Sequence, residues 1–225
     1  MRGFDIKQIH MRSFQISGLT AKWGIGDSRT LPIWDANLVG YWDARTFPDG
    51  DLATIPNTST MEGKAPDMTV SGATMAGGTL QFDGVDDYAT AGDYTSPDRF
   101  TVFWDIDWLG TAESAAGIVH VNNLYLYNHA AKGSLSCRVK LGGSWAAIPN
   151  TNVGISTAGK YYSKSGAAYN FTGTIGGDTH TGKLHIGRSS NNAAFTQVGF
   201  RQLLIFNKEL SQAEVNDVLR VMFPA

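Results

Sequence analysis

Cysteine and glutamate are the scarcest chemically active residues in this 225-residue chain. Cys137 is the single cysteine, so no disulfide can form within the chain. It lies in a strand-like alternation, where we expect a small strand residue rather than a reactive thiol. No apolar run approaches the roughly 20 residues of a transmembrane helix. The net charge of −2 gives no broad electrostatic attraction to nucleic acid or anionic membranes, so we expect neither as a partner.

Glycine is abundant, at 26 of 225 residues, which suits a chain of many short strands joined by tight turns. The strongest strand pattern runs from Phe100 to Trp108. Its alternation places Val102, Trp104, Ile106 and Trp108 on one face, which we expect to face the core. Further short strands are expected after Val121-Asn-Asn123, after Gly142-Gly-Ser144, at Tyr161-Tyr162, at Phe171–Ile175 and at Phe200–Phe206.

Several segments follow one another in the order expected of one family. In the most informative of them, Leu80 and Phe82 alternate with polar residues, Asp83-Gly84 is a turn pair, and Tyr88 restarts a strand. The segments are Leu38–Asp43, Gly78–Ala91, Phe100–Asp107, Leu184–Ser190, Gly199–Asn207 and Leu210–Val215. Together they resemble the laminin-G-like, concanavalin A-like jelly-roll superfamily, including its Phe-Asp-Gly-Val-Asp-Asp-Tyr hairpin. The resemblance implies an all-β antiparallel jelly-roll sandwich over residues 37–225.

Residues 1–36 do not match that family. They carry a net charge of +2, against −4 for the remainder, and their apolar residues show no sustained period. One interpretation is an arm that attaches the domain to a partner subunit. The alternative is an extra strand or strap that packs on the same sandwich.

One helix is expected near the C-terminus. Ser211 is a good N-cap, and Glu214 completes a capping box with it. Val215, Val218, Leu219 and Met222 then share one face of the helix. The resemblance implies that this helix packs beside the sandwich.

Paired carboxylates are the first candidates for catalysis. Glycanases of the superfamily resemble one another in a Glu-x-Asp-x-x-Glu strand, which supplies a nucleophile and a general acid. The glutamates, Glu62, Glu113, Glu209 and Glu214, do not have this spacing. Asp105 and Asp107 share a strand face, but we expect two solvent-side residues there. The five histidines are scattered and no Gly-x-Ser-x-Gly motif is present, so we expect no enzyme activity.

A calcium site is the best metal candidate, although we expect no cofactor. Asp83, Asp86 and Asp87 cluster in one turn, and carboxylate oxygens are ligands that calcium prefers. Aspartates in such turns more often accept hydrogen bonds from their own backbone, and we favour that interpretation.

Sugar binding requires an exposed aromatic ring beside amides or carboxylates. The candidates for this role lie near loops or on short strands, although most aromatics of a sandwich are buried. They are Trp145, Tyr125, Tyr127, Tyr161 and Tyr162, with Asn191 and Asn192 as amides in a loop.

The first residues, Met1–His10, lack the apolar centre of an export signal. A lectin-like domain without disulfides or an export signal suggests folding in a host cytoplasm. We therefore expect a homo-oligomeric phage virion protein, such as a head decoration, fibre or tail component. Its expected partners are virion subunits, bound through residues 1–36, and a cell-surface glycan. The alternatives are a carbohydrate-binding module of a bacterial surface or secreted protein, located outside the cell, and a divergent glycoside hydrolase.

Overall fold

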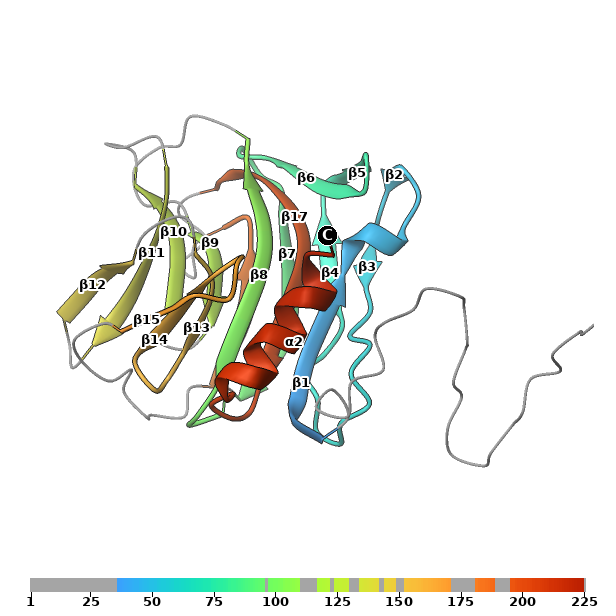
Figure 1. Cartoon of the computed structure of the whole chain (residues 1–225). Helices are drawn as coiled ribbons and strands as arrows, with labels where there is room; N and C mark the ends of the chain where they lie inside the picture. Colours follow the sequence, from blue (N-terminus) through green and yellow to red (C-terminus); the bar gives the residue numbers. More distant parts are fainter. Residues whose placement is uncertain are drawn as a thin grey trace, which may run out of the picture. The chain divides into compact units, whose positions relative to one another are not determined.

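Two antiparallel β-sheets and one C-terminal α-helix make up the fold (Figure 1). This computed structural model describes residues 36–95, 97–109, 117–121, 124–129, 134–141, 144–148, 152–170, 181–188 and 195–224. They belong to one compact unit, Leu31–Ala225. Apart from Ala36, the predicted arm lies outside the described residues, as does the predicted strand Phe171–Ile175. Both remain predictions.

The first sheet contains β1 and β17, whose residues are almost all buried. Its members are β1 (Leu38–Asp43), β2 (Gly50–Asp51), β5 (Thr74–Ala76), β6 (Thr79–Asp83), β8 (Thr101–Trp108), β13 (Asn152–Ser156), β14 (Lys160–Ser163), β15 (Ala168–Asn170) and β17 (Gln197–Phe206). Their order is β15-β14-β13-β8-β17-β6-β5-β2, and β1 also pairs with β17. The predicted strands at Leu38, Phe100, Tyr161 and Phe200 are therefore confirmed, and their first residues differ from the predicted ones by three positions at most.

The second sheet has the order β12-β11-β10-β9-β16-β7-β4-β3. Its members are β3 (Thr54–Ile55), β4 (Met68–Ser71), β7 (Tyr88–Thr95), β9 (Gly117–Val121), β10 (Leu124–His129), β11 (Ser134–Leu141), β12 (Ser144–Ile148) and β16 (Thr181–Ile186). Val121 pairs with Leu124, and Leu141 pairs with Ser144, so the strands on either side of both predicted turns are paired antiparallel neighbours. The sequence-based expectation of an all-β antiparallel sandwich is confirmed.

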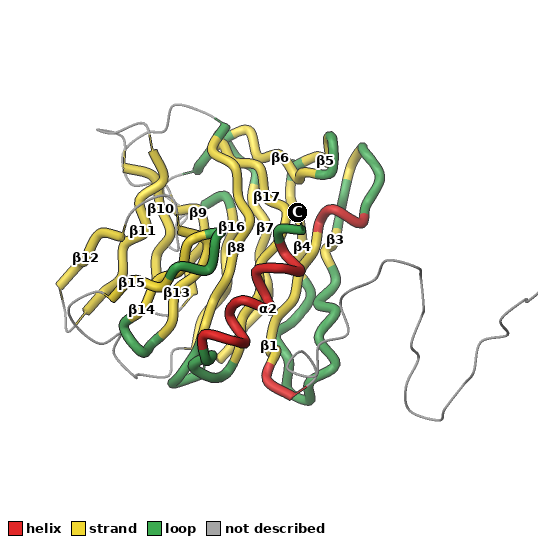
Figure 2. Tube along the Cα trace, in the orientation of Figure 1, coloured by secondary structure: helices red, strands yellow, loops and turns green. Residues whose placement is uncertain are grey.

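The central strands of the first sheet are buried on both faces. Alternate residues of β17 separate into two cores: Leu203 and Ile205 join a first core that side chains of both sheets share, including Leu184 of β16. Leu204 and Phe206 join a second core, which helix α2 (Gln212–Met222) covers. Figure 2 shows this helix lying across β1, β8 and β17. Because successive side chains of a strand point to opposite faces, β17 supplies apolar residues to both sides of the sheet.

This second core corrects the prediction for the polar face of β8. Val102, Trp104 and Ile106 do face the first core, as expected. The opposite face is buried over most of its length, because Phe103 packs against Tyr162 and Phe206 in the second core, and only Asp107 near its end stays partly exposed. Asp105 is also buried. The sequence of β8 alone does not reveal that a helix from the end of the chain covers this face.

The segment Asp83–Tyr88 is a second correction, because it does not join a hairpin. Strand β6 belongs to the first sheet and β7 to the second, so the turn carries the chain between the layers. Phe82 and Ala89 enter the first core from opposite sheets. Gly84 has φ +82°, and a Cβ there would lie 2.8 Å from the backbone nitrogen of Gln197. Only glycine fits this crossing.

Helix α2 begins with the predicted capping box. The Ser211 side chain accepts from the backbone N–H of Glu214, and Glu214 accepts from the backbone N–H of Ser211. Burial acts to raise the pKa of Glu214, but Lys208 and the Ser211 groups outweigh it and lower that pKa. The predicted apolar face of the helix is buried as expected. No helix among the described residues is long and apolar enough to cross a membrane.

Asp43 connects β1, β17 and the end of α2. Its carboxylate accepts from the Tyr41 hydroxyl at 2.9 Å, from Gln202 Nε2 at 3.0 Å and from the Arg45 guanidinium at 2.9 Å. Arg45 also donates to the carbonyl of Met222. Burial and the Asp43 carboxylate raise the pKa of Tyr41 to about 12, so its hydroxyl stays protonated and donates. The carboxylate thus gives each of these three side chains an acceptor for one of its donors.

Replacing Asp43 tests this network. Asp43→Ala leaves a buried hydroxyl, a buried amide and a partly buried guanidinium without their acceptor. We expect the free energy of unfolding to fall by about 3 kcal/mol. Asp51→Ala, at an exposed position of β2, is the matched control and should change it by less than about 0.5 kcal/mol. Equal effects of the two variants in urea titrations would contradict the role assigned to Asp43.

Candidate functional site

Two stacked tyrosines lie at the edge of the first sheet. Tyr161 of β14 pairs in register with Tyr169 of β15, and their rings stack at 5.1 Å between centroids with 15° between planes. Tyr161 is partly buried against the first core, whereas Tyr169 is 48% exposed. The partly buried ring of Tyr161 thus supports the exposed ring of Tyr169. We refer to Tyr161 and Tyr169 as the tyrosine pair.

The other predicted ligand residues have different placements. Tyr162 points to the opposite side of β14 and is buried in the second core, so it offers no ring face to a ligand. Tyr125 and Tyr127 lie on β10 and Trp145 on β12, but their side chains lie outside the described part of the structure. Asn191 and Asn192 also lie outside the described residues. Of the predicted aromatics, Tyr161 alone is described at a partly exposed position.

The turn Asp83–Asp87, which we call the aspartate turn, is acidic, and its carboxylates accept hydrogen bonds from its own backbone. Asp83 Oδ1 accepts from the Val85 N–H at 2.7 Å, and Asp87 Oδ2 accepts from the Asp83 N–H at 2.9 Å. One oxygen from each of Asp83, Asp86 and Asp87 lies within 4.8 Å of the others. Burial raises the pKa of Asp87, and the two neighbouring carboxylates add to this, against the lowering effect of its backbone bond. The predicted backbone bonding is present, and the oxygen spacing still permits a cation.

Asp105 and Asp107 lie side by side on β8, but Arg201 of β17 stands between them. Its guanidinium donates to Asp105 at 3.1 Å and also pairs with Asp107. The bond to Asp107 raises the pKa of Arg201, so the guanidinium remains charged. Both carboxylates therefore have a cationic partner. Asp105 is buried, contrary to the prediction of two solvent-side residues, because this pairing compensates its charge.

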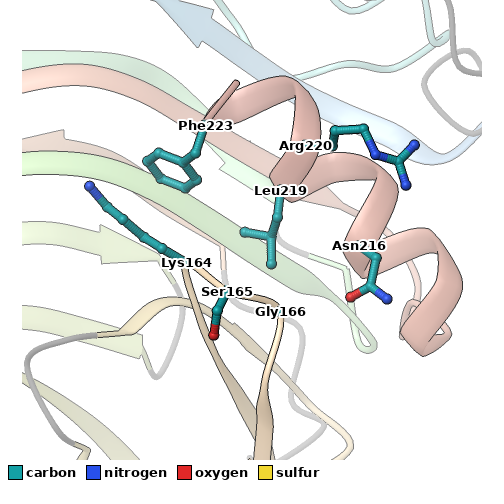
Figure 3. Close-up of a pocket in the computed structure, with 7 residues that line it drawn as sticks. All are labelled: Lys164, Ser165, Gly166, Asn216, Leu219, Arg220 and Phe223. Carbon is teal, nitrogen blue, oxygen red and sulfur yellow. The ribbon is translucent and has the colours of Figure 1, made fainter. Parts of the chain in front are cut away.

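A groove of about 290 Å³ lies between helix α2 and the turn that joins β14 to β15 (Figure 3). The turn contributes Lys164, Ser165 and Gly166. The helix end contributes Asn216, Leu219, Arg220 and Phe223. In Figure 3, Leu219 points into the space between helix and turn, and Lys164 extends beside Phe223. We refer to this as the helix groove.

Sequence reasoning missed Tyr169 and all residues of the helix groove. A signal for Tyr169 was present: Tyr161 and Tyr169 flank Gly166, and a hairpin centred near that glycine places them opposite each other. The groove gives no such signal, because its two walls are about 50 residues apart in the sequence.

Neither family models nor curated protein sequences match the chain. Several solved structures, in contrast, are similar to it in fold. Trypanosoma rangeli sialidase matches with a TM-score of 0.60 at 12% identity, over 81% of this chain and 32% of the sialidase. The same sialidase in complex with sialic acid matches with a TM-score of 0.55 at 13% identity, with the same coverage. A mutant of HCR/D matches with a TM-score of 0.57 at 12% identity, over 83% of this chain and 52% of that chain.

These likenesses show a shared β-sandwich fold, and the chain spans about a third of the sialidases' length. They also correct one expectation. The missing Glu-x-Asp-x-x-Glu motif led to the prediction of no enzyme activity, yet the structures with a similar fold include sialidases, which are enzymes. The prediction is therefore wrong as an inference from the fold family. At 12–15% identity, the likeness assigns no activity to this chain either.

The aspartate turn gives a prediction about calcium. Because Asp83 and Asp87 already accept backbone bonds, we expect the same melting temperature in millimolar calcium and in chelator. Asp83→Ala should lower the free energy of unfolding by about 1 kcal/mol in both solutions, since it removes the acceptor of Val85.

Asp86 supplies the control, because its carboxylate accepts none of the backbone hydrogen bonds of this turn among the described residues. Calcium that binds only the folded state adds about 2.7 kcal/mol at a hundredfold excess over its Kd. A rise of several degrees in calcium that Asp86→Ala abolishes would show that the turn is a metal site.

Proposed function

We propose that the domain binds glycans, and that the tyrosine pair is the surface on which a sugar ring stacks. The observation that carries the proposal is the 48% exposure of Tyr169 over a fixed second ring. Val85, Leu109 and Tyr169 are the exposed large apolar side chains among the described residues, and Tyr169 is the one aromatic among them. An exposed aromatic that is already ordered loses little entropy when a ligand covers it.

The chemistry of a sugar suits this surface. One face of a pyranose ring presents C–H groups, which pack on an aromatic ring, while its hydroxyls need hydrogen-bond partners. Ser163 lies two residues along β14 from Tyr161, on the same face of the strand, and is partly exposed. Its hydroxyl lies on the same side of the hairpin as the tyrosine pair. The similarity to a sialidase structure with bound sialic acid supports a glycan as ligand.

Tyr169→Ala tests the proposal. On an array of oligosaccharides, the variant should bind the preferred glycan at least about fivefold more weakly, because an aromatic contact contributes about 1 kcal/mol or more. Tyr169→Phe keeps the ring and should retain most of the affinity. Val85→Ala removes an exposed apolar side chain elsewhere, in the aspartate turn, and serves as the matched control. Unchanged affinity in Tyr169→Ala would refute this site.

We further propose that this adhesion acts on the surface of a phage virion, as the laminin-G-like resemblance and the lack of a disulfide suggest. In this proposal, residues 1–36 hold the domain to another virion subunit, and the protein is a decoration, fibre or tail component. Their net charge of +2, against −4 for the remainder, supports a separate role. A chain without residues 1–36 should still bind glycan and melt cooperatively, but it should fail to enter particles. An unfolded truncated chain would place the arm in the core instead.

A further inference from the structure

We propose that the helix groove binds one acidic sugar residue of a glycan, with Lys164 holding the sugar carboxylate. The inference rests on the proposed function, since it assumes a glycan ligand. It adds a second contact on the other side of the β14–β15 hairpin. Along β14, Tyr161 faces the first core while Tyr162 faces the second, and Lys164 follows on the side of Tyr162 and the helix.

The groove is held open by specific contacts. Gly166 has φ +82°, and a Cβ at this position would lie 2.6 Å from Asn216 Oδ1. Only glycine therefore lets the turn approach the helix this closely. Gln212 Nε2 donates to the Gly166 carbonyl at 2.8 Å and to Asn216 Oδ1 at 2.9 Å. These bonds fix the turn against α2, so the space beside them is a formed feature of the fold.

The charge in the groove favours an anion. None of its lining residues is acidic. Arg220 is paired with Asp217 at 3.1 Å, and Figure 3 shows its side chain directed away from Lys164. The Lys164 ammonium lies 4.6 Å from the Phe223 ring centroid and has no carboxylate partner among the described residues. A ring face attracts this cation but does not neutralise it. A ligand carboxylate would supply the missing opposite charge.

The remaining lining residues fit the rest of a sugar. Leu219 and Phe223 form an apolar wall for ring C–H groups, while Ser165 and Asn216 offer a hydroxyl and an amide for sugar hydroxyls. A volume of about 290 Å³ is at the lower end of small-molecule sites, which suits a single sugar residue. Lysine is a compact point charge with rotatable donors, so it can hold a singly charged carboxylate at the end of the groove.

The experiment compares two matched sugars on the full chain. Methyl β-D-glucuronide and methyl β-D-glucoside differ in one group, a carboxylate against a hydroxymethyl. In amide-resolved NMR titrations, the glucuronide should bind more tightly and shift the signals of Ser165, Gly166 and α2. Its affinity should fall as sodium chloride is added, because an exposed ion pair is screened. Equal affinity for the two sugars, or shifts confined to other elements, would overturn the proposal.

Lys164→Gln identifies the cation. Lys164 is exposed, so the variant should fold normally, and its glucuronide Kd should rise about tenfold, since a charge-assisted hydrogen bond is lost. Lys160→Gln removes an exposed charge at the start of β14, outside the groove lining, and should leave the Kd unchanged. Equal losses in both variants would show a general effect of charge and overturn the proposal.

Failure of this inference differs from failure of the glycan-binding proposal. If Tyr169→Ala abolishes binding to a neutral glycan while Lys164→Gln leaves glucuronide binding unchanged, the groove assignment alone is wrong. If no glycan, neutral or acidic, binds the chain at all, both proposals are wrong.

Discussion

Strand β17 is the element on which both layers of the fold depend. It pairs with β8 along most of its length, with β6 at its N-terminal half and with β1 at its C-terminal half. Leu203 and Ile205 enter the first core, and Leu204 and Phe206 enter the second. Both edges and both faces of this strand are therefore occupied by protein. Because its backbone groups and its apolar side chains are satisfied internally, the strand fixes where the second sheet and helix α2 can pack.

The candidate binding surfaces lie at the edge of the sheet, on β14 and β15, which are the third and fourth strands from β17. The central strands have no face left for a ligand, whereas the β14–β15 hairpin borders solvent. Its alternation divides the two roles: Tyr161 supports Tyr169 on the side of the first core, and Tyr162 anchors the hairpin beneath α2. Because Tyr162 holds the hairpin in place, the exposed ring of Tyr169 has a defined position. The same hairpin turn, fixed to α2 by Gln212, forms one wall of the helix groove.

Local patterns in the sequence predicted local structure well. The β8 strand, the strand at Leu124 and the Ser211 capping box depend on neighbours in the chain, and the structure contains all of them. The sheet change after Asp83 and the burial of Asp105 depend instead on distant partners, β17 and Arg201. Likewise, Tyr161 was recognisable as an aromatic candidate, but the register that brings Tyr169 onto it is a property of strand pairing. The missing Glu-x-Asp-x-x-Glu motif was the weakest basis for a prediction, because a sialidase has a similar fold.

The most direct test of glycan binding at the hairpin is backbone hydrogen exchange, measured with and without a saturating oligosaccharide. Ligand contact at the tyrosine pair should slow exchange in β14, β15 and their turn, because binding suppresses local opening of this edge. Amides of β17 should exchange slowly in both samples, since they are already bonded on both edges. Protection that appears at the aspartate turn or in the second sheet, with none in β14 and β15, would contradict the assignment of the site.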